Sequence, residues 1–201
     1  MTLTPLHIAF AWIIARRGLS VAALTIGAIV PDLEPLVGWM AGVSVFCGWD
    51  FPCSDAPDRL ILHSIAGALT VNIILTMGSV RALQFLRPER FGLYGFSNAK
   101  VASPSFALSA ALGSLSHVLV DWLHHPANPV FWPLLIDGSY YVEGLLLSFM
   151  AVWEASLLVA MVSVILLAAV IKKALNRKGQ HFLLLFSNPK KALSIITESL
   201  G

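Results

Sequence analysis

The segment Ser116-His117-Val118-Leu119-Val120-Asp121-Trp122-Leu123-His124-His125-Pro126 ends an apolar stretch that runs from Val101 to about Leu123. That stretch is long enough to cross the roughly 30 Å hydrocarbon core of a bilayer as a helix. Three residues share one face of this helix at i, i+4, i+7 spacing: His117, Asp121 and His124. An imidazole and a carboxylate one turn apart are well placed to hold a divalent cation. The final proline should end the helix and leave His125 exposed.

The composition places the whole chain in a membrane. Hydrophobic residues make up 57% of the 201 residues and charged residues 12%, whereas about 25% charged residues is typical of soluble domains. So few charges cannot cover a surface that faces water, and we therefore expect an integral membrane protein surrounded by lipid. The formal net charge of +2 is too small to indicate a nucleic-acid partner.

Two further stretches are long enough to span a bilayer, Leu60–Leu83 and Leu145–Ile171. An apolar region over residues 5–30 is interrupted by Arg16-Arg17-Gly18-Leu19-Ser20, and arginines at a bilayer centre are costly. In that interruption the glycine is typical of a helix end and the serine of a new helix start. We therefore expect a re-entrant hairpin of two short helices here, with one uninterrupted tilted helix as the alternative. The expected fold class is all-α: a polytopic membrane helical bundle with three long spans plus an N-terminal short-helix hairpin.

The distribution of basic residues predicts the orientation. Lys and Arg occur between residues 81 and 100 and again between residues 172 and 191, while residues 124–144 contain neither. Two predicted spans separate the basic regions, so both lie on one side, and the positive-inside rule assigns that side to the cytoplasm. We expect residues 1–175 to form one transmembrane domain in the inner membrane, with its histidine-rich end near the outer, periplasmic face. Residues 176–201 would form a cytoplasmic tail, either amphipathic or flexible.

Both cysteines, Cys47 and Cys53, fall in the expected outward loop from Pro35 to Pro57. A disulfide is permitted on the outer side of an inner membrane, so we predict a Cys47–Cys53 bond, with two unpaired thiols as the alternative.

Ionisable residues in or beside the predicted spans are informative, because lipid makes their placement expensive. In the hairpin His7 and Asp32 come to the same face as His63 and His117, whereas one straight helix would separate the first two by about 37 Å. A single histidine at such a position is usually a hydrogen-bonded packing residue, but several at one face favour a metal site. Zinc is the expected metal where histidines dominate, and manganese is possible. The candidate metal ligands are His7, Asp32, Asp58, His63, His117 and Asp121.

Four motifs occur in order along the chain: Thr4-Pro5-Leu6-His7, Gly27-Ala28-Ile29-Val30-Pro31-Asp32-Leu33-Glu34, Arg59…His63-Ser64 and Ser116-His117…Asp121…His125-Pro126. In them the chain resembles, over about residues 2–133, the predicted membrane-bound metal-dependent hydrolases of the YdjM type. That family is remotely similar to zinc-dependent phospholipases C and single-strand nucleases, which cleave phosphoester bonds with clustered zinc ions. The resemblance implies metal binding at the motifs that contain Asp32, His63, His117 and Asp121. Asp58 stands where the family pattern has a histidine, a departure that bears on the metal preference of that position.

These observations lead to the hypothesis of a metal-dependent hydrolase that cleaves a phosphoester of a phospholipid or a lipid-linked phosphate with metal-activated water. His124 lies about 10 Å along the helix axis from His117, too far for the same ion, so it would serve a second metal or transfer protons. The candidate catalytic residues are Glu34 or His124 as general base and Arg59 for the charge on phosphate. A divalent-metal transporter or sensor and a metal-stapled scaffold for a partner protein are the alternatives. The substrate and the oligomeric state stay open.

Overall fold

The computed structural model describes residues 4–15, 18–40, 59–87, 94–135, 139 and 141–187. In these residues every regular element is a helix, and the only β-type pairing is a single bridge between Asn128 and Val142. The all-α prediction is therefore confirmed. The elements, in chain order, are α1 (Thr4–Ile13), α2 (Val21–Gly27), the 3-10 helix η1 (Val30–Asp32), α3 (Leu33–Met40), α4 (Ile65–Ala68), α5 (Val71–Phe85), α6 (Tyr94–Ser97), α7 (Pro104–His124), the 3-10 helix η3 (Leu145–Ser148) and α8 (Val152–Ser187).

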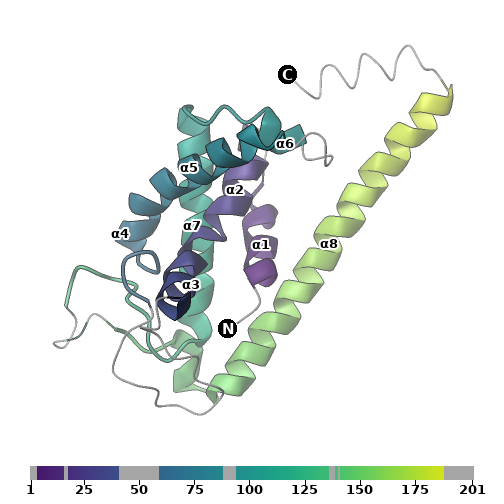
Figure 1. The fold of residues 1–201 in the computed structure, drawn as a ribbon. Helices are drawn as coiled ribbons and strands as arrows, with labels where there is room; N and C mark the ends of the chain where they lie inside the picture. Colours follow the sequence, from purple (N-terminus) through teal and green to yellow (C-terminus); the bar gives the residue numbers. More distant parts are fainter. Residues whose placement is uncertain are drawn as a thin grey trace.

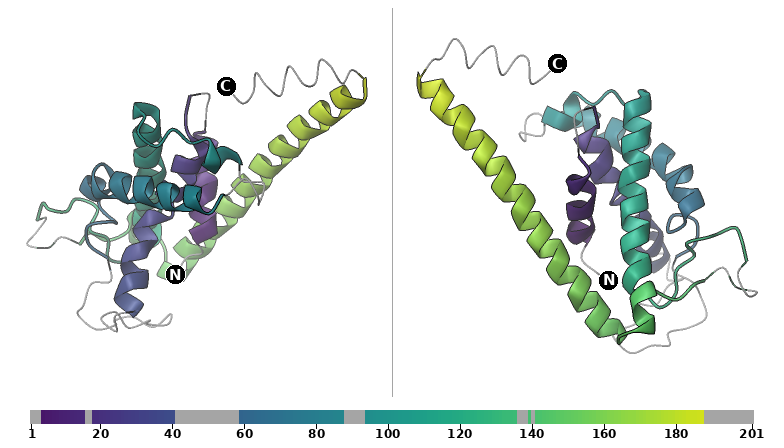
Figure 2. Two further views of the ribbon diagram at one scale, coloured as in Figure 1. Left: turned by 45° about the horizontal axis from the view of Figure 1, so that its top comes forward. Right: turned by 180° about the vertical axis from the view of Figure 1, so that it is seen from behind.

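Helix α7 lies at the centre of the molecule and contacts α1, α2, α4, α5, η3 and α8 (Figure 1). Helix α8 packs mainly on α1, and Figure 2 shows its C-terminal part extending away from the bundle. Pro104–His124 of α7 and Val152–Lys172 of α8 are long and apolar enough to cross a membrane. The predicted spans that begin at Val101 and Leu145 thus correspond to these two helices.

The prediction of a third long span over Leu60–Leu83 is wrong. Residues 60–64 form a loop instead of a helical turn, because backbone N–H groups in it donate to the carboxylate of Glu34. The short α4 ends at Ala68, and α5 begins only at Val71. Between the two helices the hydroxyl of Thr70 donates to the carbonyl of Ala66. The separate α5 has 15 residues, which gives it a length of about 22 Å, short of a bilayer core.

Helices α1 and α2 form the predicted hairpin. Gly18 has a φ of +87°, a left-handed conformation that glycine adopts without steric cost. The hydroxyl of Ser20 accepts the N–H of Ala23 at 3.3 Å and caps α2. The indole N–H of Trp12 donates to Thr25 at 2.9 Å and joins the two helices. The helix-start signal of Ser20 is confirmed and the uninterrupted helix is excluded, whereas the prediction that Gly18 ends the first helix is wrong, because α1 already ends at Ile13.

Helices α2 and α7 cross at backbone contact. A Cβ atom added to Gly27 would lie 2.5 Å from the carbonyl oxygen of Ala110, and one added to Gly113 would lie 2.3 Å from that of Leu24. Any larger residue at either position would therefore push the helices apart. This crossing sets where the chain leaves α2 and enters η1 and α3.

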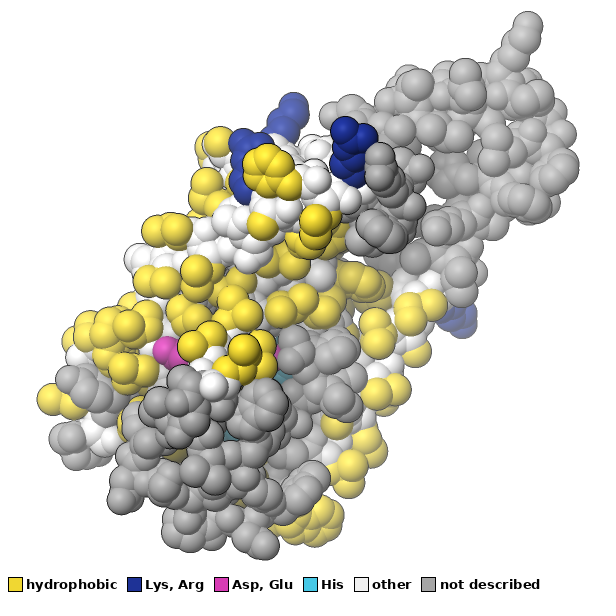
Figure 3. Space-filling model, viewed as in Figure 1, with side chains coloured by type: hydrophobic (Ala, Val, Ile, Leu, Met, Phe, Trp, Pro, Cys, Tyr) yellow, Lys and Arg dark blue, Asp and Glu magenta, His cyan; other side chains and the backbone are white. Residues whose placement is uncertain are grey.

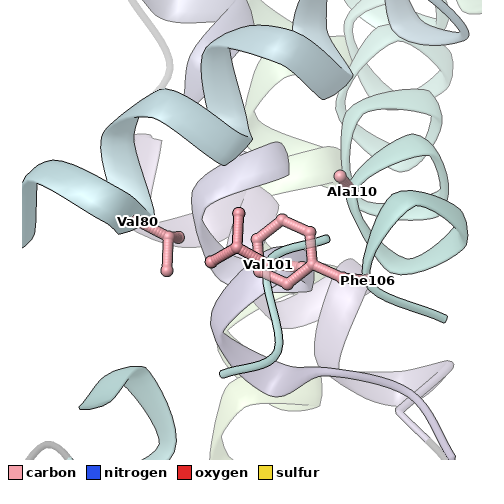
Figure 4. Close-up of a cluster of buried hydrophobic side chains, with 5 residues drawn as sticks. Val80, Val101, Phe106 and Ala110 are labelled. Carbon is pink, nitrogen blue, oxygen red and sulfur yellow. The ribbon is translucent and has the colours of Figure 1, made fainter. Parts of the chain in front are cut away.

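Toward the N-terminal end of α7, apolar side chains fill the space between the helices. Phe106 of α7 is fully buried and packs in one cluster with Ala23, Val80, Val101 and Ala110 (Figure 4). Burial of such side chains contributes about 1.5–3 kcal/mol each for the larger ones. The buried histidines and Asp121 lie toward the other end of α7.

The outer surface is mostly apolar, as expected for a protein in lipid. Figure 3 shows hydrophobic side chains over the length of the bundle and Lys or Arg side chains near the end where α6 lies. Arg81, Arg87 and Lys100 are exposed. Residues 41–58, which include both cysteines, and the tail from residue 188 lie outside the described residues, so the disulfide stays a prediction.

The close crossing of α2 and α7 makes Gly113 sensitive to substitution. We expect Gly113→Ala to lower the free energy of unfolding by about 1–3 kcal/mol, because the added methyl group overpacks the contact with Leu24. Gly78→Ala is the matched control, since a Cβ there meets nothing within 4 Å. Thermal unfolding in detergent measures both. Equal midpoints for the two variants would contradict the close crossing.

Candidate metal centre

Four side chains from three parts of the chain converge in the C-terminal half of α7. The Nε2 atom of His117 lies 3.5 Å from Oδ1 of Asp32 and 3.5 Å from Oδ2 of Asp121. The Nε2 atom of His63 lies 3.5 Å from Oδ2 of Asp121 and 4.0 Å from Oδ1 of Asp32. Two ligand atoms of one tetrahedral zinc ion, each bound at about 2.0–2.1 Å, are separated by about 3.4 Å. The ligand atoms of Asp32, His63 and His117 all lie within 4.8 Å of one another, and so do those of His7, His117 and Asp121, so each of these sets is spaced as the ligands of a metal ion would be.

Both histidines present the same ring atom to this cluster. The Nδ1 atom of His117 lies 2.7 Å from the carbonyl oxygen of Ala28, which can only accept a hydrogen bond, so Nδ1 carries the hydrogen. The Nδ1 atom of His63 lies 3.2 Å from Oε2 of the Glu34 carboxylate, which fixes the same tautomer. In the neutral rings Nε2 then carries the lone pair that a metal ligand needs.

Several of the converging atoms are buried and make no hydrogen bond within the described part of the chain. Among the described residues, Nε2 of His63, Nε2 of His117 and both carboxylate oxygens of Asp121 have no hydrogen-bond partner. The three side chains are almost completely inaccessible to solvent. Buried polar atoms are normally hydrogen-bonded, so a set of unpartnered acceptors that face one another indicates a site for a cation.

The charge of the cluster leads to the same conclusion. Asp32, Glu34 and Asp121 supply three carboxylates, and the one guanidinium beside them is that of Arg59, 3.4 Å from Asp121. With neutral imidazoles the described cluster has an excess of two negative charges. Such an excess is expensive in a protein interior, and one divalent cation would neutralise it.

A second group of histidines lies on the other side of Asp121. The Nε2 atom of His7 is 3.4 Å from Oδ1 of Asp121, and the Nε2 atom of His125 is 3.6 Å from the same oxygen. Asp121, His124 and His125 also have ligand atoms within 4.8 Å of one another. Oδ2 of Asp121 faces His63 and His117 while Oδ1 faces this second group, so the carboxylate lies between two possible metal positions.

Arg59 is near both groups. Besides its contact with Asp121, its Nη2 lies 3.2 Å from Nε2 of His125. The hydroxyl of Tyr141 donates to the backbone carbonyl of Arg59 at 3.0 Å, and the amide of Asn128 donates to the carbonyls of Asp121 and His125. The structure thus adds Tyr141 and Asn128 to the surroundings of the cluster.

The predicted candidates are therefore distributed as follows. His7, Asp32, His63, His117 and Asp121 are brought together, whereas Asp58 lies outside the described residues. The expectation that His125 is exposed is wrong: only 16% of its side chain is accessible, and its ring lies against Arg59 and the ring of His124. In the sequence, the i, i+4 spacing of Asp121 and His125 indicates the contact between these two side chains.

The carboxylate of Glu34 points to the loop before α4. Burial by itself raises the pKa of Glu34, but hydrogen bonds from His63 and from the N–H groups of Leu60 and Leu62 outweigh it and hold the pKa below its usual value. Glu34 therefore stays ionised at neutral pH.

The sequence profile of the YdjM inner membrane protein family matches residues 2–188. The chain belongs to this family. The match includes every residue of the two histidine groups as well as α8, and the family's inner-membrane description agrees with two helices that could span a bilayer. No curated protein and no solved structure matches the chain.

We expect this YdjM family member, purified in detergent, to retain divalent metal through gel filtration. Asp121→Asn and His117→Ala should each lose most of it, because each removes a ligand atom from the cluster. Elemental analysis measures the metal, and circular dichroism checks that the helices persist. His181→Ala, in the later part of α8, is the control and should keep its metal. A wild-type protein that binds neither zinc nor manganese would contradict the site.

Proposed function

We propose that the protein is a membrane-embedded, metal-dependent hydrolase that cleaves a phosphoester of a phospholipid or a lipid-linked phosphate. The supporting observation is that the buried His63, His117 and Asp121 meet the partly exposed Asp32 beside an arginine. A donor set of imidazoles and carboxylates suits zinc, with manganese as the second choice. The chemistry that such an ion supplies when bound is the activation of water as a nucleophile near neutral pH.

Arg59 is suited to hold the phosphate of the substrate. Its guanidinium is partly buried, with 11% of the side chain accessible, and it lies between Asp121 and His125. A planar guanidinium binds phosphate oxygens through paired N–H groups, and in a water-poor site it stabilises the charge that develops on them.

His124 is the candidate general base. Its Nδ1 atom lies 2.9 Å from the carbonyl oxygen of Val120, so Nδ1 carries the hydrogen and Nε2 is the basic atom of the ring. At Nε2 the imidazole can take up the proton of an attacking water. Its place beside Asp121 and His125 keeps this atom within the second histidine group.

A lipid-borne substrate is favoured by the surface around the accessible edge of the cluster. Asp32 and Glu34 have 17% and 21% of their side chains accessible, while His63 and His117 are buried. These two acids stand at the start of α3, which exposes Leu36 (39%), Val37 (60%) and Met40 (75%). A polar head can therefore reach the cluster while its acyl chains stay against apolar surface.

The distribution of charge supports an orientation with the cluster near the outer face. Arg81 in the C-terminal part of α5, Arg87 just after it and Lys100 shortly before α7 are exposed, and Figure 3 shows Lys or Arg side chains at the end of the bundle where α6 lies. The positive-inside rule assigns that end, and with it the C-terminus that follows α8, to the cytoplasm.

The reaction is tested with purified, metal-loaded protein in vesicles that contain phosphatidylglycerol, phosphatidylethanolamine or a polyprenyl phosphate ester. We expect release of headgroup or phosphate from at least one of these lipids, and its loss in Asp121→Asn. Release only from a water-soluble phosphoester would place the substrate outside the membrane. No release by a protein shown to contain metal would overturn the proposed reaction.

Arg59→Ala should lower the turnover about 100-fold or more, the usual effect of removing one charge-stabilising donor. Arg87→Ala is the matched control: Arg87 is exposed near the far end of the bundle, so turnover should not change. Headgroup release measured at equal metal content compares the two variants. Similar turnover in both would remove Arg59 from the site.

A further inference from the structure

Three successive backbone N–H groups donate to one carboxylate. The N–H of Leu60 lies 2.8 Å from Oε2 of Glu34, that of Ile61 2.9 Å from Oε1, and that of Leu62 3.2 Å from Oε2. Consecutive amides that point to one side form a concave nest for an anion. Here the anion is a side chain of α3, so α3 and the loop of residues 59–63 are joined at this point.

The same carboxylate also orients a candidate metal ligand. Oε2 of Glu34 lies 3.2 Å from Nδ1 of His63, the residue that follows the three amides. One side chain thus fixes the backbone of the loop and the tautomer and direction of its imidazole. Carboxylates that hold a ligating histidine in this way set the affinity of metal sites.

Two backbone carbonyl groups of the loop accept hydrogen bonds from side chains of other segments. The buried amide of Asn72 in α5 donates to the carbonyl of Leu62 at 2.8 Å, and the hydroxyl of Tyr141 donates to the carbonyl of Arg59. Glu34 supplies the acceptors and these two residues supply the donors. Together they hold the loop in the shape that places Arg59 and His63 at the cluster.

We propose that Glu34 serves as a positioning residue, which holds the 59–63 loop and His63 in place for metal, in preference to the role of general base. All four donors to its carboxylate from the described residues come from this loop: the N–H groups of Leu60 and Leu62 and Nδ1 of His63 meet Oε2, and the N–H of Ile61 meets Oε1. At most one acceptor position of Oε1 is then left for the water that a general base would need. This inference rests on the proposed metal-dependent function.

Glu34→Gln distinguishes the two roles. The amide nitrogen of glutamine is a donor that would face the donors of the loop, so the loop must shift and carry His63 with it. We expect the metal concentration at half-saturation to rise about 10–100-fold, in the range found when a partner of a metal ligand is removed. Excess metal should restore the metal content and a part of the turnover. Loss of a general base would leave metal affinity unchanged and abolish turnover at any metal concentration.

The experiment titrates the chelator-treated, full-length protein with Co²⁺ and follows its visible absorption, with zinc competition for the affinity. Glu143→Gln is the matched control, because Glu143 is exposed, and it should titrate like the wild type. Glu34→Asp keeps the charge but withdraws the carboxylate by one methylene group, so it should also lose affinity. If Glu34→Gln does not fold, Glu34→Asp decides.

The outcomes separate the two proposals. Wild-type affinity in a folded Glu34→Gln or Glu34→Asp protein would overturn the positioning role and leave the proposed function in place. A wild-type protein that binds neither cobalt nor zinc would overturn the metal-dependent function itself.

Discussion

The backbone contact between α2 and α7 is the constraint on which the rest of the structure depends. Because Gly27 and Gly113 have no side chains, the helices approach closely enough for the carbonyl of Ala28 to accept the Nδ1 hydrogen of His117. The chain then turns directly through η1 into α3. That turn carries Asp32 to the other side of the same imidazole. A contact that has no polar chemistry of its own thus sets the geometry of the most polar part of the molecule.

The polar cluster and its apolar surroundings depend on each other. In water the carboxylates and imidazoles would each be hydrated, and nothing would hold them 3.5 Å apart. In this structure the bundle removes water from Asp121 and from the rings of His63 and His117. The low polarity that makes the cluster costly without a cation also strengthens its attraction for one. Unlike the side chains of His63, His117 and Asp121, that of Asp32 stays partly exposed.

Local sequence signals predicted the parts of the site that local structure determines. The spacing of His117 and Asp121 placed both on one face of a helix, and the structure keeps them there. The span predicted over Leu60–Leu83 failed because its first residues form hydrogen bonds to Glu34, more than 20 residues earlier in the chain, and apolar composition carries no sign of such a contact. Asn128 lies in an irregular segment after α7, where neither periodicity nor a motif indicates that its amide supports the helix end. Contacts between segments that are far apart in the sequence can be identified only from the three-dimensional structure.

The long helix α8 contributes no side chain to the histidine groups found in the described residues. It packs mainly on α1. The buried residues in its described part, Ala155, Val159 and Ser163, share one helix face, and most of its described apolar side chains are exposed. The candidate metal ligands and this long apolar helix therefore lie in different parts of the chain. Substitutions in α8 that keep it apolar should therefore disturb the candidate metal ligands less than substitutions between α1 and the end of α7.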